Sequence, residues 1–288
     1  MLPFTLEFNR FRLKLGPETC IMGILNTTSD SFSDGGKFNT FETAVEQGIK
    51  LVKDGAHILD IGGESARPFA APISEQEELD RVIPVIENLS KRIDVPISID
   101  TVKSGVAREA LDAGAAIIND ISAFEKDPAM ADLAAKRGVP VVLMHMKGTP
   151  ETMQVNPDYD DLMFEITNYL ASRAEYAMEK GIKKNHIILD PGIGFGKTIE
   201  HNLVLINYLE KICALGYPVL VGPSRKSFIQ NILTKKENTP IGADHIKTEY
   251  GSLAAVAASI LNGAHIVRVH DVEKVKSFTH IIDSIRNA

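Results

Sequence analysis

The sequence is short of cysteine, tryptophan and positive charge. It contains two cysteines, no tryptophan and a formal net charge of −7 at pH 7. Nucleic-acid-binding domains usually carry a basic surface that neutralises phosphates, so this acidic balance argues against a nucleic-acid partner. Cys20 and Cys213 lie far apart in the chain and have no neighbours at metal-binding spacing. This pattern favours free thiols in a reducing compartment.

Long apolar runs and targeting signals are also missing. The longest apolar run, LAAVAASIL at 253–261, is too short to span a bilayer and indicates a buried helix. The first residues, MLPFTLEF, include no basic segment of the kind that begins a secretory signal. We therefore expect a cytoplasmic protein with no membrane partner.

The sequence does contain a regular alternation of strand-like and helix-like segments. Eight short apolar runs occur at 20–26, 57–63, 95–101, 115–122, 139–146, 186–192, 218–224 and 264–271. Nearly continuous apolar runs are typical of parallel strands buried on both faces. Helix-like segments lie between them, including one at 201–216, and most end in glycine, as helix C-termini often do.

This alternation predicts an α/β protein built as a single-domain (β/α)8 TIM barrel over residues 19–288. Residues 1–18 are expected to form a short N-terminal hairpin that closes the barrel floor. A doubly wound open sheet, with helices on both faces, is the alternative architecture.

Polar residues gather where the predicted strands end, which is the end of a barrel that carries its chemistry. A single Asp or Asn at such a position is usually a helix cap or turn residue. Here a polar group follows all eight strands, which predicts a functional site. The residues are Asn26, Asp60, Glu64, Arg67, Asp100, Asn119, Asp120, His145, Asp190, Ser224, Arg225, Lys226, Ser227, Arg268, His270 and Asp271.

These side chains divide into two chemical groups. Asp100, Asn119 and Asp190 offer acceptors that suit the donor edge of an amino-substituted heterocycle. Cationic and hydrogen-bonding groups near the last two strands, with a helix expected to begin at the SRKS segment, suit an anion such as phosphate. Asn26 could help to hold Mg²⁺, which commonly uses few protein oxygens together with phosphates and water. No HExxH or CxxC spacing indicates zinc.

The segment LDPGIGFGKT at 189–198 is close to a nucleotide phosphate-binding loop but does not have its spacing. That loop requires a glycine five residues before its Gly-Lys pair, because successive backbone amides wrap around the phosphates. Counting back from Gly196, the required glycine falls on Pro191. A nucleotide-hydrolysing function is therefore not predicted.

Eight blocks, in order and over about residues 21–272, resemble the dihydropteroate synthase family. They are MGILNTTSDSFSDGG, LDIGGESARP, ISIDT, INDIS, LMHMKGTP, LDPGIGFGKT, GPSRKSFI and GSLAAVAASILNGAHIVRVHDV. The resemblance implies a (β/α)8 transferase, usually a homodimer. Such an enzyme joins 6-hydroxymethyl-7,8-dihydropterin diphosphate to p-aminobenzoate with Mg²⁺. It releases diphosphate and gives 7,8-dihydropteroate for folate synthesis, and sulfonamides target it.

Site residues are carried over from the resemblance one position at a time. It implies a pterin pocket of Asp100, Asn119, Asp190, Lys226, Arg268, Met144 and Phe195. It implies that Asn26, Arg67, Arg268 and His270 surround the diphosphate, and that Asn26 is the Mg²⁺ ligand. It places p-aminobenzoate near Pro68, Ser227 and Lys226. Asp100, Lys226, Arg268 and His270 are the expected catalytic residues.

Three positions depart from the family pattern. Ser29 replaces the Pro of the usual NVTPDSF loop, while Ala66 and Phe69 replace the Thr and Gly of the usual ESTRPGA loop. We hypothesise that the Phe69 ring obstructs sulfonamides more than the substrate, with a neutral packing change as the alternative. Two other functions stay open: a methyltetrahydrofolate:corrinoid methyltransferase, and a catalytically inactive pterin-binding paralogue.

Overall fold

The computed structural model describes residues 2–27, 37–67 and 69–288. Its large sheet contains eight parallel strands in the order β8, β7, β6, β5, β4, β3, β10, β9. The strands are β3 (Cys20–Asn26), β4 (Ile58–Gly62), β5 (Ile97–Asp100), β6 (Ile117–Asp120), β7 (Val141–Met144), β8 (Ile187–Asp190), β9 (Leu220–Val221) and β10 (Ile266–Val269). The predicted seventh strand, at 218–224, is therefore present but is reduced to two residues.

The two ends of this sheet meet, which makes it a barrel. Leu189 of β8 bridges Val219 in parallel, and the Leu189 amide donates a 2.9 Å hydrogen bond to the carbonyl of Pro218. An open doubly wound sheet would leave its two outer strands unpaired with each other. The barrel prediction is confirmed.

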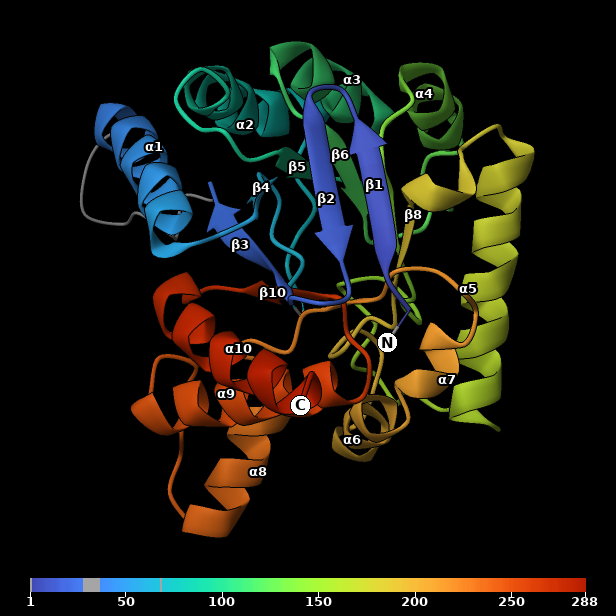
Figure 1. Cartoon of the computed structure of the whole chain (residues 1–288). Helices are drawn as coiled ribbons and strands as arrows, with labels where there is room; N and C mark the ends of the chain where they lie inside the picture. The colour runs from blue at the N-terminus through green and yellow to red at the C-terminus, as the bar shows by residue number, and fades with distance from the viewer. Residues whose placement is uncertain (1, 28–36, 68) are drawn as a thin grey trace.

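Helices surround the strands as a ring (Figure 1). They are α1 (Lys37–Asp54), α2 (Glu75–Leu89), α3 (Ser104–Ala113), α4 (Ala129–Arg137), α5 (Leu162–Glu179), α6 (Ile199–Asn207), α7 (Glu210–Cys213), α8 (Ser227–Glu237), α9 (Ile246–Leu261) and α10 (Val272–Arg286), with a 3-10 turn, η2, at Lys184–His186. The helix expected over 201–216 is interrupted at Tyr208, which leaves α6 and α7 as separate pieces. None of the helices in the described ranges is long and apolar enough to cross a membrane.

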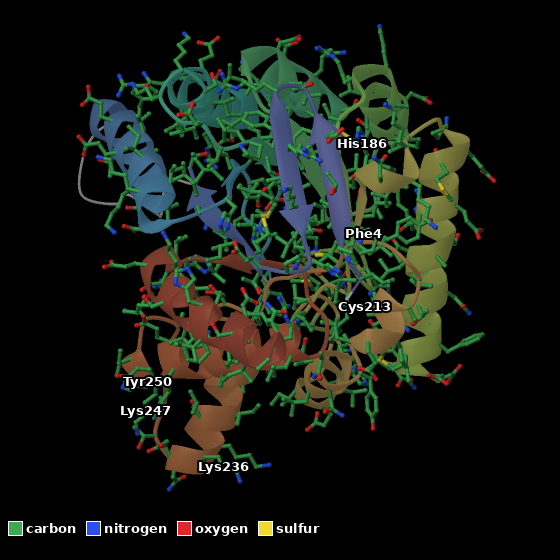
Figure 2. All side chains as sticks on the ribbon, viewed as in Figure 1. Phe4, His186, Cys213, Lys236, Lys247 and Tyr250 are labelled. Atoms are coloured by element: carbon green, nitrogen blue, oxygen red, sulfur yellow. The ribbon has the colours of Figure 1, made fainter. Side chains whose placement is uncertain are left out.

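The hairpin of β1 (Phe4–Phe8) and β2 (Phe11–Leu15) lies across one end of the barrel (Figure 1). Its apolar side chains pack with those that point into the barrel interior, including Met22, Ile117 and Val142. The ring nitrogen Nε2 of His186 lies 3.0 Å from the carbonyl oxygen of Glu7, and Figure 2 shows His186 beside the hairpin. The end with the hairpin is therefore filled, and the opposite end is available for a site.

Candidate active site

The carboxyl ends of the barrel strands bring most of the expected residues together. Parallel pairing places Asn26 beside Gly62, Gly62 beside Asp100, and Asp100 beside Asn119. Paired residues of neighbouring parallel strands project toward the same side of the sheet. The acceptors expected for the heterocycle thus lie at one level of the barrel.

Arg268, on β10, reaches across this end of the barrel to two carboxylates. Its Nε donates to Asp60 Oδ2 at 2.6 Å, and its Nη2 donates to Asp100 Oδ2 at 2.7 Å. Asn119 Nδ2 donates to the same Asp60 oxygen at 3.1 Å. Asp60 Oδ1 is buried and has no hydrogen-bond partner within the described ranges. One guanidinium therefore organises an acceptor-rich pocket floor.

The electrostatics of this floor favour a partly protonated carboxyl group. Burial raises the pKa of Asp100 to about 7, against the opposing effect of the nearby Arg268 cation, and the Asp60 carboxylate adds to the rise. Burial likewise raises the pKa of Asp190 to about 6, although the Gly192 amide donates to its Oδ1 at 2.7 Å. The protonation state of these carboxyl groups therefore changes near neutral pH, and a cation that approaches them favours the ionised form.

A lysine and an aromatic ring form the wall beside Asp190. Lys226 Nζ lies 3.9 Å from the centre of the Phe195 ring, a cation–π distance. Phe195 packs with the buried Met144 and Met153 in a small apolar cluster. Burial lowers the pKa of Lys226 to about 8, with Arg268 adding to the decrease. This wall is apolar with one cation, which suits the face and edge of a flat heterocycle.

His270 and the start of α8 lie next to this wall. His270 Nδ1 lies 3.0 Å from Ser224 Oγ, and burial lowers the pKa of His270 to about 3. Ser227 is exposed and is the first residue of α8, with Lys226 at the N-cap position. The helix expected after the SRKS segment is confirmed, and its first amides carry the partial positive charge that attracts anions.

The remaining expected residues lie nearer the solvent. Asn26 ends β3 and is half-buried, and Arg67 is exposed. Pro68 and Ser29 lie outside the described residues. A cavity of about 530 Å³ opens beside Asp100, and its lining includes Ala66 and Lys103. The pocket floor therefore connects to a space large enough for a second small molecule.

Two polar residues at strand ends have structural partners instead. Asp120 accepts hydrogen bonds from the Ser122 and Phe124 amides in the turn after β6. Asp271 is the N-cap of α10, where it accepts from the amide of Lys274. These contacts match the ordinary capping and turn roles of Asp, so not every polar strand end belongs to the pocket.

Comparison with known proteins agrees with this geometry. Residues 22–270 match the family model described as pterin binding enzyme. The dihydropteroate synthase of Synechocystis sp. is 47% identical over 270 residues, covering 94% of this chain and 91% of that protein. The chain belongs to the dihydropteroate synthase family.

Two solved structures of this family superpose closely on the chain. The Yersinia pestis dihydropteroate synthase, in complex with a sulfonamide drug, has a TM-score of 0.90, 42% identity and coverage of 99% of this chain and 100% of its own. The Xanthomonas albilineans dihydropteroate synthase with 4-aminobenzoic acid has a TM-score of 0.90, 40% identity and full coverage of both chains. Membership of the family makes the chain an enzyme, a transferase.

Sequence reasoning left two residues of this site without a role. The sequence shows only that Asp60 lies at the end of a strand, and its complete burial and its contacts with Arg268 and Asn119 emerge only from the fold. Lys197 belongs to the segment that lacks the spacing of a phosphate-binding loop, and in the fold its side chain is buried, with 2% exposure. A charged residue inside an otherwise apolar strand, as in ILDIG, was the available signal for Asp60.

Proposed function

We propose that this site condenses 6-hydroxymethyl-7,8-dihydropterin diphosphate with p-aminobenzoate, giving 7,8-dihydropteroate and diphosphate. The observation that carries the proposal is the acceptor-rich pocket floor of Asp60, Asp100 and Asn119, organised by Arg268. Asp190 supplies a further acceptor at the end of strand β8. A pterin presents an amino group beside a ring N–H, and a carboxylate accepts from such an edge with both oxygens.

We propose a role for each expected pterin residue. Asp190, Asp100 and Asn119 accept from the pterin edge, and Lys226 donates to a pterin acceptor from beside the Phe195 ring. The planar guanidinium of Arg268 provides a surface for the flat ring system. Met144 and Phe195 supply the apolar wall.

The reaction needs an activated electrophile, because an aromatic amine is a weak nucleophile. The bond between the pterin methylene carbon and the diphosphate oxygen breaks first, and its electron pair leaves with the oxygen. The resulting cation is delocalised into the pterin, and the Asp100 and Asp190 carboxylates stabilise it. The amine nitrogen then bonds to the methylene carbon and loses a proton. No protein nucleophile takes part.

The leaving diphosphate is stabilised by cationic and donor groups. Arg268 and His270 come from β10 and the residue that follows it, and Arg67 comes from the exposed loop after β4. His270 is neutral in the free protein, because its pKa lies near 3, so it acts there as a hydrogen-bonding group. The additional negative charge that develops on the diphosphate as the bond breaks strengthens each of these contacts.

The residues at the barrel mouth fit Mg²⁺ only as an ion that arrives with the diphosphate. No group of three His, Cys, Asp or Glu side chains that could hold a metal occurs in the described ranges. The side-chain oxygen of Asn26 suits Mg²⁺, which completes its shell with phosphate oxygens and water. When bound, the ion would neutralise charge on the leaving diphosphate.

p-Aminobenzoate is proposed to bind at the mouth of the pocket near Lys226, Ser227 and Pro68. The start of α8 offers backbone amides to its carboxylate. Phe69 is 70% exposed on the loop after β4, and its amide donates to the carbonyl of Pro150 at 2.9 Å. A sulfonamide that extends beyond the volume of p-aminobenzoate would approach this loop.

We also propose a cytoplasmic homodimer. An apolar groove of about 700 Å³ runs between α6, α8 and α9, and its lining includes the exposed Leu203 and Tyr208. Exposed apolar patches of this kind often bind a partner subunit. Leu203→Glu places a charge in this groove and should shift the protein from dimer to monomer in sedimentation experiments.

The cytoplasmic location is proposed from the cysteines. Cys20 and Cys213 are free thiols, which suits a reducing compartment.

Diphosphate release from the purified protein tests the proposed reaction. The protein would be given the pterin diphosphate and Mg²⁺, with and without p-aminobenzoate, while dihydropteroate is followed. Release matched by equal dihydropteroate supports the synthase. Tight pterin binding with neither release nor product would indicate an inactive paralogue, and methyl transfer from methyltetrahydrofolate would indicate the methyltransferase.

A further inference from the structure

Lys197 is a buried lysine in the turn that follows β8. Its Nζ donates to the carbonyl oxygens of Phe195 at 2.8 Å and His145 at 3.3 Å, and it lies 3.0 Å from His145 Nδ1. Lysine is seldom buried without such partners, since desolvating an ammonium group is costly. The ammonium group therefore joins the turn after β8 to the end of β7.

Three neutral side chains hold the rest of this turn. Gln154 Nε2 donates to the Gly194 carbonyl at 2.8 Å, and the Tyr159 hydroxyl donates to the Gly196 carbonyl at 2.8 Å. Asn202 Oδ1 accepts from the Gly194 amide at 2.6 Å. Lys197 is the charged member of this set.

The turn packs directly on the segment after β7. Gly192 and Gly196 have φ values of +69° and +65°, and a Cβ atom at either position would overlap the carbonyl oxygen of His145 or Lys147. Glycine is favoured at both positions for its left-handed backbone and for the close approach. The two segments are thus in contact, with the Lys197 ammonium group between them.

The same turn carries two walls of the pterin pocket. It begins at Asp190, whose Oδ1 accepts from the Gly192 amide, and it presents the Phe195 ring to the Lys226 ammonium group. We propose that Lys197 is a positioning residue for pterin binding, which clamps this turn so that Asp190 and Phe195 face the pocket. This inference rests on the proposed function.

The charge of Lys197 also acts on Asp190. Burial lowers the pKa of Lys197 to about 7, so its ammonium group is charged in the range near pH 6 where Asp190 titrates. The cations that face Asp190 and lower its pKa are Lys226, Lys197 and Arg268. His145 stays neutral in this range, because burial and Lys197 lower its pKa to about 3. Removing the Lys197 charge should raise the pKa of Asp190 further.

The test is the binding of 6-hydroxymethylpterin by Lys197→Met between pH 5 and 8, measured by calorimetry. Affinity at pH 6.5, where Lys197 is charged, should fall about tenfold or more, because the charge-assisted hydrogen bonds that hold a binding group are lost. In a plot of affinity against pH, the acidic limb is the range in which affinity falls as Asp190 becomes protonated. The midpoint of this limb should rise by about half a pH unit or more, because a cation that stabilises the Asp190 carboxylate has been removed.

Tyr159→Phe is the matched control, since it removes one hydrogen bond from the same turn and no charge. Its affinity should fall less, and its acidic limb should stay at the wild-type pH. Lys197→Gln, which keeps an amide donor but no charge, replaces Lys197→Met if that variant does not fold. It should show the same upward shift of the limb.

An unmoved acidic limb in both Lys197 variants, or affinity equal to wild type, would overturn the inference. The outcome is separate from that of the proposed function. If the wild-type protein fails to bind the pterin or to make dihydropteroate, the proposed function is wrong. If the wild-type protein succeeds and the Lys197 variants behave as wild type, only the positioning role is wrong.

Discussion

Asp60→Ala is the substitution whose consequence follows most directly from the pocket floor. It removes a carboxylate that is fully buried and that accepts from Arg268 at 2.6 Å and Asn119 at 3.1 Å. Removing one partner of a buried ion pair typically costs about 3–5 kcal/mol. Arg268 keeps its contact with Asp100, so the lower end, about 3 kcal/mol, is expected.

That cost converts into a measurable loss of thermal stability. Unfolding entropy near the midpoint is about 2.1 cal/mol/K per residue, or about 0.6 kcal/mol/K for a chain of this length. A loss of about 3 kcal/mol therefore lowers Tm by about 5 °C, as followed by circular dichroism. Pterin affinity should fall about tenfold or more, because Arg268 and Asn119 lose the acceptor that orients them.

Asp161→Ala is a suitable control for this experiment. Asp161 is an exposed N-cap whose side chain accepts from the amide of Phe164, at the start of α5. Loss of an N-cap costs about 1 kcal/mol, so Tm should fall by about 2 °C with no change in pterin affinity. A change no larger than this in Asp60→Ala, with normal pterin affinity, would refute the structural role assigned to Asp60.

Three further predictions concern the pterin, the diphosphate and the inhibitor. Pterin affinity of the wild type should fall about tenfold from pH 7 to pH 5, because the Asp190 carboxylate, with its pKa raised to about 6, is protonated as the pH falls. Asp190→Asn should bind the pterin more weakly, and calorimetric titrations should no longer show the part of the fall in affinity that comes from protonation of Asp190. An unchanged dependence of affinity on pH would contradict the role of Asp190 in pterin binding. His270→Ala should lower kcat for diphosphate release far more than it changes pterin affinity, and a change confined to KM would show that the residue does not act in the departure step. Phe69 has a φ of +65°, a left-handed backbone conformation that costs a residue with a side chain about 1 kcal/mol. Glycine adopts this conformation without that cost, so Phe69→Gly should not destabilise the loop. The same variant should gain sulfonamide affinity relative to p-aminobenzoate, and equal ratios of inhibition constant to substrate affinity in both proteins would remove the hypothesis.

The barrel could be predicted from the sequence because its signals are local and repeated. Each strand is a short apolar run, and a glycine after the helix, such as Gly114 or Gly138, adopts the left-handed conformation that ends α3 or α4. Periodicity could not show that β9 is only Leu220–Val221 or that the helix over 201–216 breaks at Tyr208. The residues at which these elements end depend on how neighbouring strands and helices pack, which is not a property of the segment alone.

The sequence by itself determined the family, the strand ends and the acceptor and donor types of the site. Only the tertiary structure decided which of these side chains meet. Asp120 and Asp60 both lie in short apolar strands, and the sequence does not distinguish them. Asp120 closes a local turn, whereas Asp60 binds Arg268, which lies 208 residues away in the chain. Such a contact exists only when the sheet closes and brings distant strands together. A carboxylate then has a partner, a pKa and a role that its own neighbours in the chain do not specify.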